Sequence, residues 1–274
     1  MADPNDPGVV KGTTNDDLIE VGYTDSDGDS VTNGPDTIFG LAGDDTIDGG
    51  GGDDTIYGDS GGAPTVVREV FQWCDGPSFS DGANTPNFTL DTGLAAISFS
   101  TVSQSSGVDS EYETETQNTD DLDAAVGTNS AFASVLNGDP NSAHYKWESD
   151  TPIENVEFRI NDIDGDGRVI VRAYDENGDP IEVILSDAGS GIALSDTDAV
   201  SGNETASSVD DNYTSQSAAE HSVLVTIPGP VSSWEIIHEQ DGSHNTGITV
   251  TDIAFDVADY SDTDGNDVIY GDDG

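Results

Sequence analysis

A nine-residue motif recurs five times in this chain, and its fixed phase constrains the fold more than any other feature. The copies begin at residues 12, 31, 40, 49 and 262, with the sequences GTTNDDLIE, VTNGPDTIF, GLAGDDTID, GGGGDDTIY and DTDGNDVIY. The sixth position is always Asp, at Asp17, Asp36, Asp45, Asp54 and Asp267. The eighth is always Ile, at Ile19, Ile38, Ile47, Ile56 and Ile269. The fourth is Asn or Gly, at Asn15, Gly34, Gly43, Gly52 and Gly265. Low-complexity linkers do not hold such a phase, so the motif predicts a repeating fold.

Each position of the motif has a physical role. A short strand around the Ile directs one apolar side chain inward, where it stacks on the Ile of a neighbouring coil. The Gly-rich half turns tightly, because Gly tolerates positive φ at little cost. Such a turn points backbone carbonyls into a small concavity, to which the Asp adds a charged oxygen. Ca²⁺ prefers six to eight oxygen ligands, more than one loop supplies, so we expect each ion to be shared between adjacent coils.

The spacing matches the pattern G-G-x-G-x-D-x-U-x, and the chain resembles the RTX (haemolysin-type calcium-binding repeat) proteins over about sixty residues. The resemblance implies a calcium-binding parallel β-roll in which two nonapeptides form one coil, so that ligands pair from each repeat to the next but one. On that rule Asp36 pairs with Asp54, and Asp17 with Asp45. It also implies Ca²⁺ as the cofactor, with the five Asp residues and Gly34, Gly43, Gly52 and Gly265 as the metal site. The location it implies is extracellular or at the cell surface, reached by type I secretion.

The charge balance fits this resemblance. The 274 residues hold 56 Asp and Glu against six Lys and Arg, a formal net charge of −50. Such a charge excludes nucleic acid and anionic membranes as electrostatic partners, and without calcium it favours a disordered state of the loops. Cys74 is the only cysteine, so calcium, and not a disulfide, would stabilise the fold. No run of about 18 apolar residues occurs, which predicts that no segment spans a membrane.

The motif is absent between Tyr57 and Asp262. We expect residues 1–62 to form the N-terminal part of the roll, residues 63–260 a β-sandwich module inserted into it, and residues 261–274 its continuation. Gly58-Asp59-Ser60 matches the first third of a repeat and Gly265–Tyr270 the remainder. Insertions at exposed turns are tolerated when the termini of the insert lie close together. The repeat with Asp267 would then stack on the repeat with Asp54; the alternative is a separate C-terminal roll.

Within the insert the hydrophobic period is two. We expect strands at residues 65–73, 94–102, 110–117, 144–148, 153–160, 168–174, 181–185, 222–227, 233–239 and 247–255, bounded by turns of Gly, Asp, Asn and Pro. They predict an antiparallel, jelly-roll-like β-sandwich, and hence an all-β chain. The pattern permits a helix only within residues 120–136 and predicts an irregular segment over 186–219. The run from Ile153 to Phe255, with HSVLVTIPGP and GITVTDIAFD, loosely resembles β-sandwich modules of secreted bacterial surface proteins and carbohydrate-binding modules.

Two acidic turns outside the repeats are further calcium candidates. Their carboxylates are Asp162, Asp164 and Asp166 in DIDGDG, and Asp25, Asp27 and Asp29 in DSDGDS. DIDGDG does not begin an EF-hand, because the twelfth position is Ala173, which cannot ligate a metal. The alternative for both segments is a solvated polar turn.

Aromatic side chains are the candidates for binding a sugar. Tyr112 and Tyr213 stand in polar surroundings, so we expect them to be exposed and to contact a ligand. Trp73 and Trp147 are also candidates, with a place in the sandwich core as the alternative.

A catalytic site cannot be assembled from this sequence, so we do not predict an enzyme. The four His residues form no HExxH motif, although His238 and His244 bracket an acidic turn, and no G-x-S-x-G segment occurs. The leading hypothesis is a secreted calcium-binding module whose sandwich binds an extracellular polysaccharide, as an adhesin or carbohydrate-binding module does. The alternatives are a calcium-dependent structural protein of a surface layer, matrix or fibre that self-associates through the ends of the roll, and a polysaccharide-active enzyme.

Overall fold

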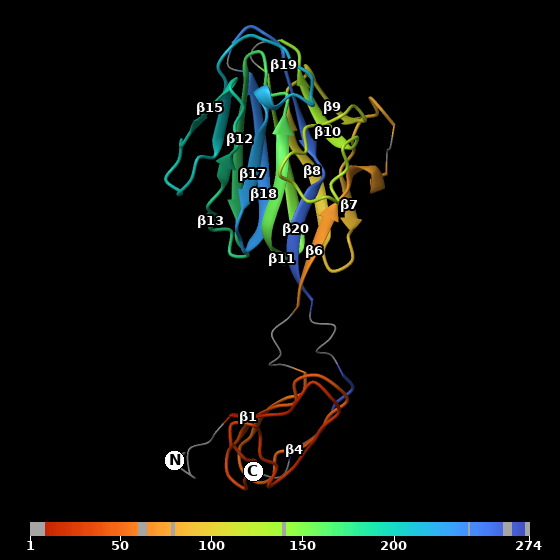
Figure 1. Ribbon diagram of the computed structural model, residues 1–274, viewed down its shortest axis with the longest axis vertical. Coiled ribbons are helices and arrows are strands. Elements are labelled where there is room, and N and C mark those ends of the chain that lie inside the picture. Colours follow the sequence, from red (N-terminus) through yellow and green to blue (C-terminus); the bar gives the residue numbers. More distant parts are fainter. Residues whose placement is uncertain are drawn as a thin grey trace. The chain divides into compact units, whose positions relative to one another are not determined.

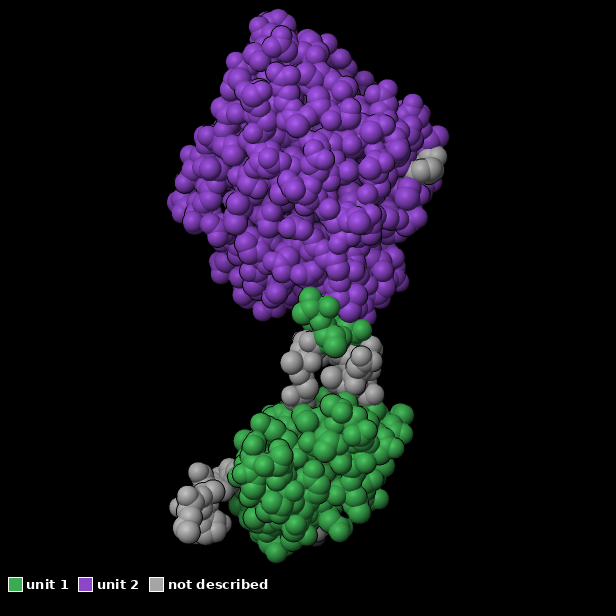
Figure 2. Space-filling model, viewed as in Figure 1, with its two compact units in different colours: residues 1–66, 258–274 green, residues 67–257 purple. Residues whose placement is uncertain are grey.

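The computed structural model describes residues 9–59, 65–77, 80–138, 141–240, 242–259 and 265–271, and this part of the chain is all-β, as predicted (Figure 1). Its helical elements are two short 3-10 turns, η1 (Trp73–Asp75) and η2 (Ala219–His221). A helix that is apolar and long enough for a membrane crossing is not found among the described residues. The chain divides into two compact units, one of residues 1–66 with 258–274 and one of residues 67–257 (Figure 2).

The first unit is a parallel β-roll. Its strands are β1 (Val9–Lys11), β2 (Leu18–Ile19), β3 (Thr37–Phe39), β4 (Thr46–Asp48), β5 (Thr55–Tyr57) and β21 (Val268–Tyr270). They form two sheets with the orders β1-β3-β5 and β2-β4-β21, in which all neighbours are parallel. Consecutive repeats alternate between the two sheets, so each repeat pairs with the next but one, as expected for two nonapeptides per coil.

The C-terminal strand corrects one expectation. β21 pairs with β4 in the register Ile269↔Ile47, so the repeat with Asp267 stacks on the repeat with Asp45. The prediction that it stacks on the repeat with Asp54 is wrong. Because two repeats make one coil, a repeat and its immediate predecessor lie in opposite sheets and cannot pair. The start of the fifth copy, residues 262–264, lies outside the described residues.

The inward positions of the motif form the core of the roll. Ile19, Ile38 and Ile47, from the eighth position, lie in one cluster of buried side chains together with Val10 and Val31. Tyr23 and Ile56 pack against this cluster. The apolar eighth position thus stacks from coil to coil, and the rest of each repeat is free to form turns.

The fourth position of the third and fourth copies needs Gly for two reasons. Gly43 and Gly52 have φ values of +110° and +122°, which L side chains rarely adopt. A Cβ on Gly43 would also lie 2.6 Å from the carbonyl carbon of Asn15, and one on Gly52 would lie 2.6 Å from that of Gly34. The turns of successive coils therefore stack through their backbones, with no room for a side chain between them.

Replacing Gly43 by Ala tests this close approach. We expect the roll to lose more than about 1 kcal/mol of stability, because the new Cβ forces strain and a backbone clash together. Thermal unfolding at saturating calcium, followed by circular dichroism, measures the loss. Gly271→Ala is the matched control, since a Cβ there meets nothing within 4 Å. Equal midpoints for the two variants would contradict the packing described.

The second unit is a β-sandwich. Its strands are β6 (Thr65–Phe71), β7 (Phe88–Asp91), β8 (Ala96–Gln104), β9 (Val108–Glu113), β10 (Ala131–Leu136), β11 (Ser142–Asn161), β12 (Gly167–Tyr174), β13 (Pro180–Ile181), β14 (Ile184–Ser186), β15 (Ile192–Ser195), β16 (Thr205–Ser208), β17 (Val223–Ile227), β18 (Val231–Gln240), β19 (Thr246–Thr251) and β20 (Ile253–Asp259). One sheet has the order β7-β8-β11-β18-β12-β16-β15, with β13 beside β12. The other has the order β9-β10-β19-β11-β17-β14, with β20 also paired to β11.

The long strand β11 belongs to both sheets. Its first part pairs with β8 and β18, and its second part pairs with β17, β19 and β20. The register shifts between Glu148 and Ile153, where the strand passes from one sheet to the other. The expected strands at 144–148 and 153–160 are therefore two halves of one element.

Aromatic rings from both sheets fill the interior. The ring of Phe132 in β10 lies 5.0 Å from that of Phe99 in β8 and 4.7 Å from that of Tyr145 in β11. Trp147 and Trp234 stack with their ring centroids 5.9 Å apart. Aromatic pairs at such distances add to the stabilisation that burial of their surface already gives.

This core overturns the expectation that Tyr112 is exposed. Tyr112 lies opposite Phe132 in the β9–β10 pair and is 1% exposed, and Trp73 and Trp147 are buried as well. The polar neighbours of Tyr112 mark the outer face of β9, and the tyrosine itself occupies the inner face. These three aromatic side chains cannot stack on a ligand that arrives from solvent.

Two segments differ from the sequence analysis. The helix that the pattern permitted within residues 120–136 is absent, and the last six of these residues form β10, which pairs with β9 and β19. A strand that is covered on both faces shows a continuous apolar run and no alternation, so the pattern AFASVL gave no strand signal. The segment 186–219, expected to be irregular, contains β15 and β16.

The buried His238 in β18 makes stability depend on pH. Its Nδ1 lies 3.0 Å from the Oγ of Ser134, and burial lowers its pKa from 6.5 to about 3. The folded imidazole stays neutral, but the unfolded one binds a proton below about pH 6.5. The contribution of the neutral His238 to the free energy of unfolding is therefore fully present above that pH. It falls by about 1.4 kcal/mol per pH unit as the pH drops towards 3.

Urea unfolding at pH 7 and pH 5, followed by tryptophan fluorescence at saturating calcium, measures this effect. The loss between the two conditions should be smaller by about 2 kcal/mol in His238→Gln, which has no titrating ring. Both proteins have the same carboxylates, so the contribution of these groups to the pH dependence cancels when the variant is compared with the wild type. An identical pH dependence in the two proteins would show that His238 is not held neutral by the fold.

Candidate metal centres

The Asp residues of the repeats form two ladders along the roll. In one, the backbone N–H of Asp17 donates to Oδ1 of Asp45 at 2.8 Å, and the N–H of Asp45 donates to Oδ1 of Asp267 at 3.0 Å. In the other, the N–H of Asp36 donates to Oδ1 of Asp54 at 2.9 Å. The carboxylates of Asp45, Asp54 and Asp267 thus accept hydrogen bonds from the neighbouring coil, and the pairs Asp17–Asp45 and Asp36–Asp54 come together as expected.

The second carboxylate oxygen folds back over the turn of its own repeat. A Cβ on Gly49 would lie 2.5 Å from Oδ2 of Asp54, and one on Gly40 would overlap Oδ2 of Asp45. A side chain at the first position of these repeats would therefore occupy the space in front of the carboxylate. Gly at this position therefore leaves room for the carboxylate to lie against the turn.

Asp45 is the ladder carboxylate that most favours a bound cation. Its side chain is 1% exposed, and its Oδ2 has no hydrogen-bond partner in the described part of the chain. Burial raises its pKa against the donor from Asp17, and the nearby charges of Asp267, Asp17 and Asp59 raise it further. An unpartnered buried carboxylate oxygen is costly. Carboxylate and peptide oxygens form the donor set that Ca²⁺ prefers, so these residues fit the ion.

The C-terminal repeat is completed by residues from the N-terminal segment. A Cβ on Gly58 would overlap Oδ2 of Asp267, as one on Gly40 would overlap that of Asp45. The backbone N–H of Gly265 donates to Oδ1 of Asp59 at 2.6 Å, across a separation of 206 residues. Gly58 therefore takes the first position relative to Asp267, although the two are remote in sequence.

The DSDGDS segment uses its first carboxylate for the turn itself. Oδ1 of Asp25 accepts hydrogen bonds from the backbone N–H groups of Asp27, Gly28 and Asp29, and its Oδ2 accepts one from Lys11. These donors lower the pKa of Asp25 although burial opposes them. The described geometry does not gather Asp25, Asp27 and Asp29 into one three-carboxylate group.

In the DIDGDG segment, the carboxylate of Asp166 is separated from those of Asp162 and Asp164. Asp162 and Asp164 lie against each other, and burial together with the charge of Asp164 raises the pKa of Asp162 to about 8. The Oδ2 of Asp164 accepts a hydrogen bond from the N–H of Thr214 at 3.2 Å. Asp166 points elsewhere and joins a different group. The three carboxylates therefore do not converge on one point.

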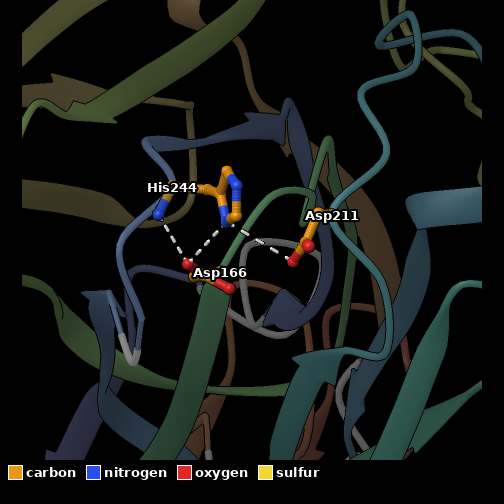
Figure 3. Close-up of side chains that lie close together, drawn as sticks. All are labelled: Asp166, Asp211 and His244. Carbon is orange, nitrogen blue, oxygen red and sulfur yellow. Dashed lines mark hydrogen bonds and ion pairs between the residues drawn. The ribbon is translucent and has the colours of Figure 1, made fainter.

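Asp166 meets His244 and Asp211, as Figure 3 shows. The Nδ1 of His244 lies 3.1 Å from Oδ2 of Asp166 and 3.5 Å from Oδ1 of Asp211. The backbone N–H of His244 also donates to Oδ2 of Asp166 at 2.6 Å, and this bond is the main reason why the pKa of Asp166 is lowered. His238, by contrast, lies in the core. This group can hold an ion pair when the imidazole is protonated, or a metal ion when it is neutral.

A second group, which the sequence did not single out, consists of Asp196, Asp198 and Glu204, with ligand atoms within 4.8 Å of one another. Asp211 was also missed. Both lie in the segment expected to be irregular, and the contact of Asp211 with His244 joins residues remote in sequence. No periodicity signals such a contact.

Tyr213 differs from the other three aromatic candidates. It is 60% exposed, and its hydroxyl donates to the backbone O of Asn245 at 2.9 Å. A Cβ on Gly165 would lie 3.2 Å from that hydroxyl, so Tyr213 borders the DIDGDG turn. Its ring is therefore an accessible aromatic surface beside an acidic group.

Replacing Asp45 by Asn tests the ladder. The change keeps the size of the side chain but removes the charge, so we expect the calcium midpoint for folding of the roll to rise by about tenfold, with lower cooperativity. A calcium titration followed by circular dichroism measures both. Asp53→Asn is the control, because it removes the same charge at an exposed position of a neighbouring repeat. If the calcium midpoint shifts equally in both variants, the effect of Asp45→Asn is explained by the loss of net charge, and the role of Asp45 as a ligand is contradicted.

Comparison with known proteins agrees with the repeats. The family model of the RTX calcium-binding nonapeptide repeat matches residues 30–62 and 260–274, with four copies. No curated protein matches the chain. Among solved structures the chain is similar to the enzymatically active domain of tailspike protein 4 of bacteriophage CBA120, with 10% identity and a TM-score of 0.30. It is also similar to a mutant of a family 29 carbohydrate-binding module, with 9% identity and a TM-score of 0.23.

The extents of these likenesses differ. The first covers 92% of this chain but only 38% of the tailspike domain, and the second covers 61% of this chain and 95% of the carbohydrate-binding module. Neither TM-score is high enough to carry an argument about the sandwich. The assignment of the repeats does not depend on these two structures. Residues 30–62 and 260–274 are RTX nonapeptide repeats, and calcium is the ion that such repeats bind.

Proposed function

We propose that this chain is a secreted calcium-binding module in which calcium folds the roll and the sandwich binds an extracellular glycan. The calcium part is carried by one observation, the buried Oδ2 of Asp45, which has no partner among the described residues. RTX repeats are typical of extracellular proteins, and type I secretion is the route that the resemblance implies. Weak extracellular calcium sites suit the calcium levels found outside cells.

The mechanism is thermodynamic linkage. The carboxylate ladders exist only in the folded roll, so calcium stabilises the folded state by RT ln(1 + [L]/Kd), about 2.7 kcal/mol per site at a hundredfold excess over Kd. Where free calcium is low, the net charge of −50 favours an expanded chain. Such a chain would stay unfolded during export and would fold outside the cell.

The domain arrangement that we propose is a sandwich of residues 63–260 inserted into a single repeat. The two parts of this repeat are Gly58–Ser60 and Gly265–Tyr270. The proposal is supported by the contact of Gly58 with Asp267 and by the hydrogen bond from Gly265 to Asp59. Closing that repeat around calcium would bring both ends of the insert together.

The glycan part rests on the surroundings of Tyr213. An exposed aromatic ring offers a flat apolar face of the kind on which sugar rings stack, and neighbouring carboxylates accept hydrogen bonds from hydroxyl groups. Asp166 and Asp211 supply such carboxylates near the ring, and His244 lies beside them. Since Tyr112, Trp73 and Trp147 are buried, Tyr213 is the remaining member of the four candidates.

A glycan array tests this site. The wild-type protein in calcium should bind at least one glycan, and Tyr213→Ala should weaken that binding by tenfold or more, since stacking on an aromatic ring would be lost. Tyr270→Ala is the matched control, because Tyr270 is similarly exposed, at 56%, but lies in the roll. If no glycan binds, or if Tyr213→Ala binds as the wild type does, the glycan site is refuted.

A calcium-triggered assembly protein is the second candidate, and one observation favours it. β21 is an edge strand of its described sheet, and its Ile269 is 48% exposed although the equivalent Ile47 is fully buried. Such an edge presents unpaired backbone groups and an apolar side chain to another chain. Light scattering during a calcium titration separates the candidates: constant particle size supports the binding module, and growth together with the β signal supports assembly.

A further inference from the structure

A cluster of three carboxylates stands at the loop between β15 and β16. We call Asp196, Asp198 and Glu204 the Glu204 cluster; one carboxylate oxygen of each lies within 4.8 Å of those of the other two. Asp196 and Asp198 are exposed, whereas Glu204 is 5% exposed. This cluster belongs to the sandwich and contains no residue of the RTX repeats.

The buried member of the cluster is only half satisfied. Oε1 of Glu204 accepts hydrogen bonds from the backbone N–H of Thr197 at 2.7 Å, from the hydroxyl of Thr205 at 2.8 Å, and from the hydroxyl of Thr197. Its Oε2 is buried and has no hydrogen-bond partner among the described residues. Burial raises the pKa of Glu204, but these donors outweigh it and leave the pKa below its usual value. The side chain is therefore a buried anion at neutral pH.

Beside this anion lies a cavity of about 30 Å³, bordered by Asp198 and Glu204 and by apolar side chains of β12 and β13. A space of this size holds one water molecule or a small ion. Arg172 also borders the cavity, but its side chain is exposed. Among the described residues, no basic side chain forms an ion pair with Asp196, Asp198 or Glu204.

We propose that Asp196, Asp198 and Glu204 bind a divalent cation, calcium, in the sandwich and independently of the roll. Three converging carboxylates repel one another unless a cation lies between them. The donors are all oxygens, which favours Ca²⁺ over metals that prefer nitrogen or sulfur. Oε2 of Glu204 would gain its missing partner, and the remaining ligand positions would go to water and to the aspartates.

The cation would fasten a loop to the sheet. The backbone O of Glu204 accepts a hydrogen bond from the N–H of Val171 in β12 at 2.8 Å, so Glu204 is anchored to the sandwich. Asp198 stabilises its own turn by accepting the N–H of Val200 at 2.7 Å, and lies on the loop side. An ion between Asp198 and Glu204 therefore holds the β15–β16 loop against the edge of the sheet.

Tryptophan fluorescence separates this site from the roll. The three Trp residues, Trp73, Trp147 and Trp234, all lie in residues 67–257. Trp234 also pairs with Ala173, which borders the cavity. Thermal unfolding of the full chain, excited at tryptophan, thus reports the sandwich even while the roll binds calcium.

The test compares Glu204→Gln with the wild type in CaCl₂ and in EDTA. Calcium should raise the sandwich midpoint of the wild type by roughly 5–10 °C at a hundredfold excess over Kd. It should raise that of Glu204→Gln by far less. In EDTA the variant should be at least as stable as the wild type, because Gln keeps an acceptor for Thr197 and Thr205 while removing a repelling charge.

Three further variants sharpen the result. Asp198→Asn, at an exposed position, should also lose the calcium shift, and Glu176→Gln, an exposed change of the same charge, should keep it. Asp45→Asn in the roll should keep it as well. The proposal is overturned if the wild type shows no shift, if Glu204→Gln shifts as the wild type does, or if it is destabilised equally in CaCl₂ and EDTA. The last outcome would assign Glu204 to hydrogen bonding alone.

Discussion

The roll depends on carboxylates that its own side chains cannot neutralise. Of the six basic residues, only Lys11 lies in the roll, just before the first repeat, and the other five lie in the sandwich. There they form ion pairs, such as those of Arg68 with Asp256 and of Arg159 with Asp187. The two units therefore differ. Some carboxylates of the sandwich have basic partners, whereas the described carboxylates of the roll form no ion pair with a Lys or Arg side chain, so we expect the folding of the roll to depend on a cation from solution.

The geometry of the roll follows from this requirement. Stacking carboxylates on successive coils demands backbone turns that approach closely, and only Gly fits where Gly43 and Gly52 stand. The same rule explains why Gly58 and Asp267 belong together although a whole sandwich separates them in sequence. In the proposed arrangement, the groups that would surround one ion come from both sides of the insert. The contacts of Gly58, Asp59 and Asp45 with the C-terminal repeat support this arrangement.

Sequence predicted what is periodic and failed on what is not. The constant spacing of Asp and Ile indicated the roll, because each position repeats the same environment, and the resemblance to RTX repeats implied the two-repeat coil and the Asp pairs. The partner of the Asp267 repeat was wrong because the coil rule was not carried across the insert. Tyr112 was misplaced because polar neighbours describe only the outer face of a strand. The groups around His244 and Glu204 could not be found, since they depend on contacts between remote segments that no local pattern records.

Buried carboxylates in this protein fall into two kinds, and the difference indicates where calcium belongs. Asp252 is fully buried, yet its oxygens accept hydrogen bonds from the N–H of Trp73, the N–H of Gly127 and the hydroxyl of Ser130. It needs no further partner and serves to join loops to the core. Asp45 and Glu204 each retain one buried oxygen without a donor in the described chain. Asp162 also has such an oxygen, but its pKa of about 8 favours the protonated carboxyl group. Because a buried anionic oxygen must be compensated, the unpartnered oxygens support the calcium sites proposed at Asp45 and at the Glu204 cluster, and Asp252 needs no cation.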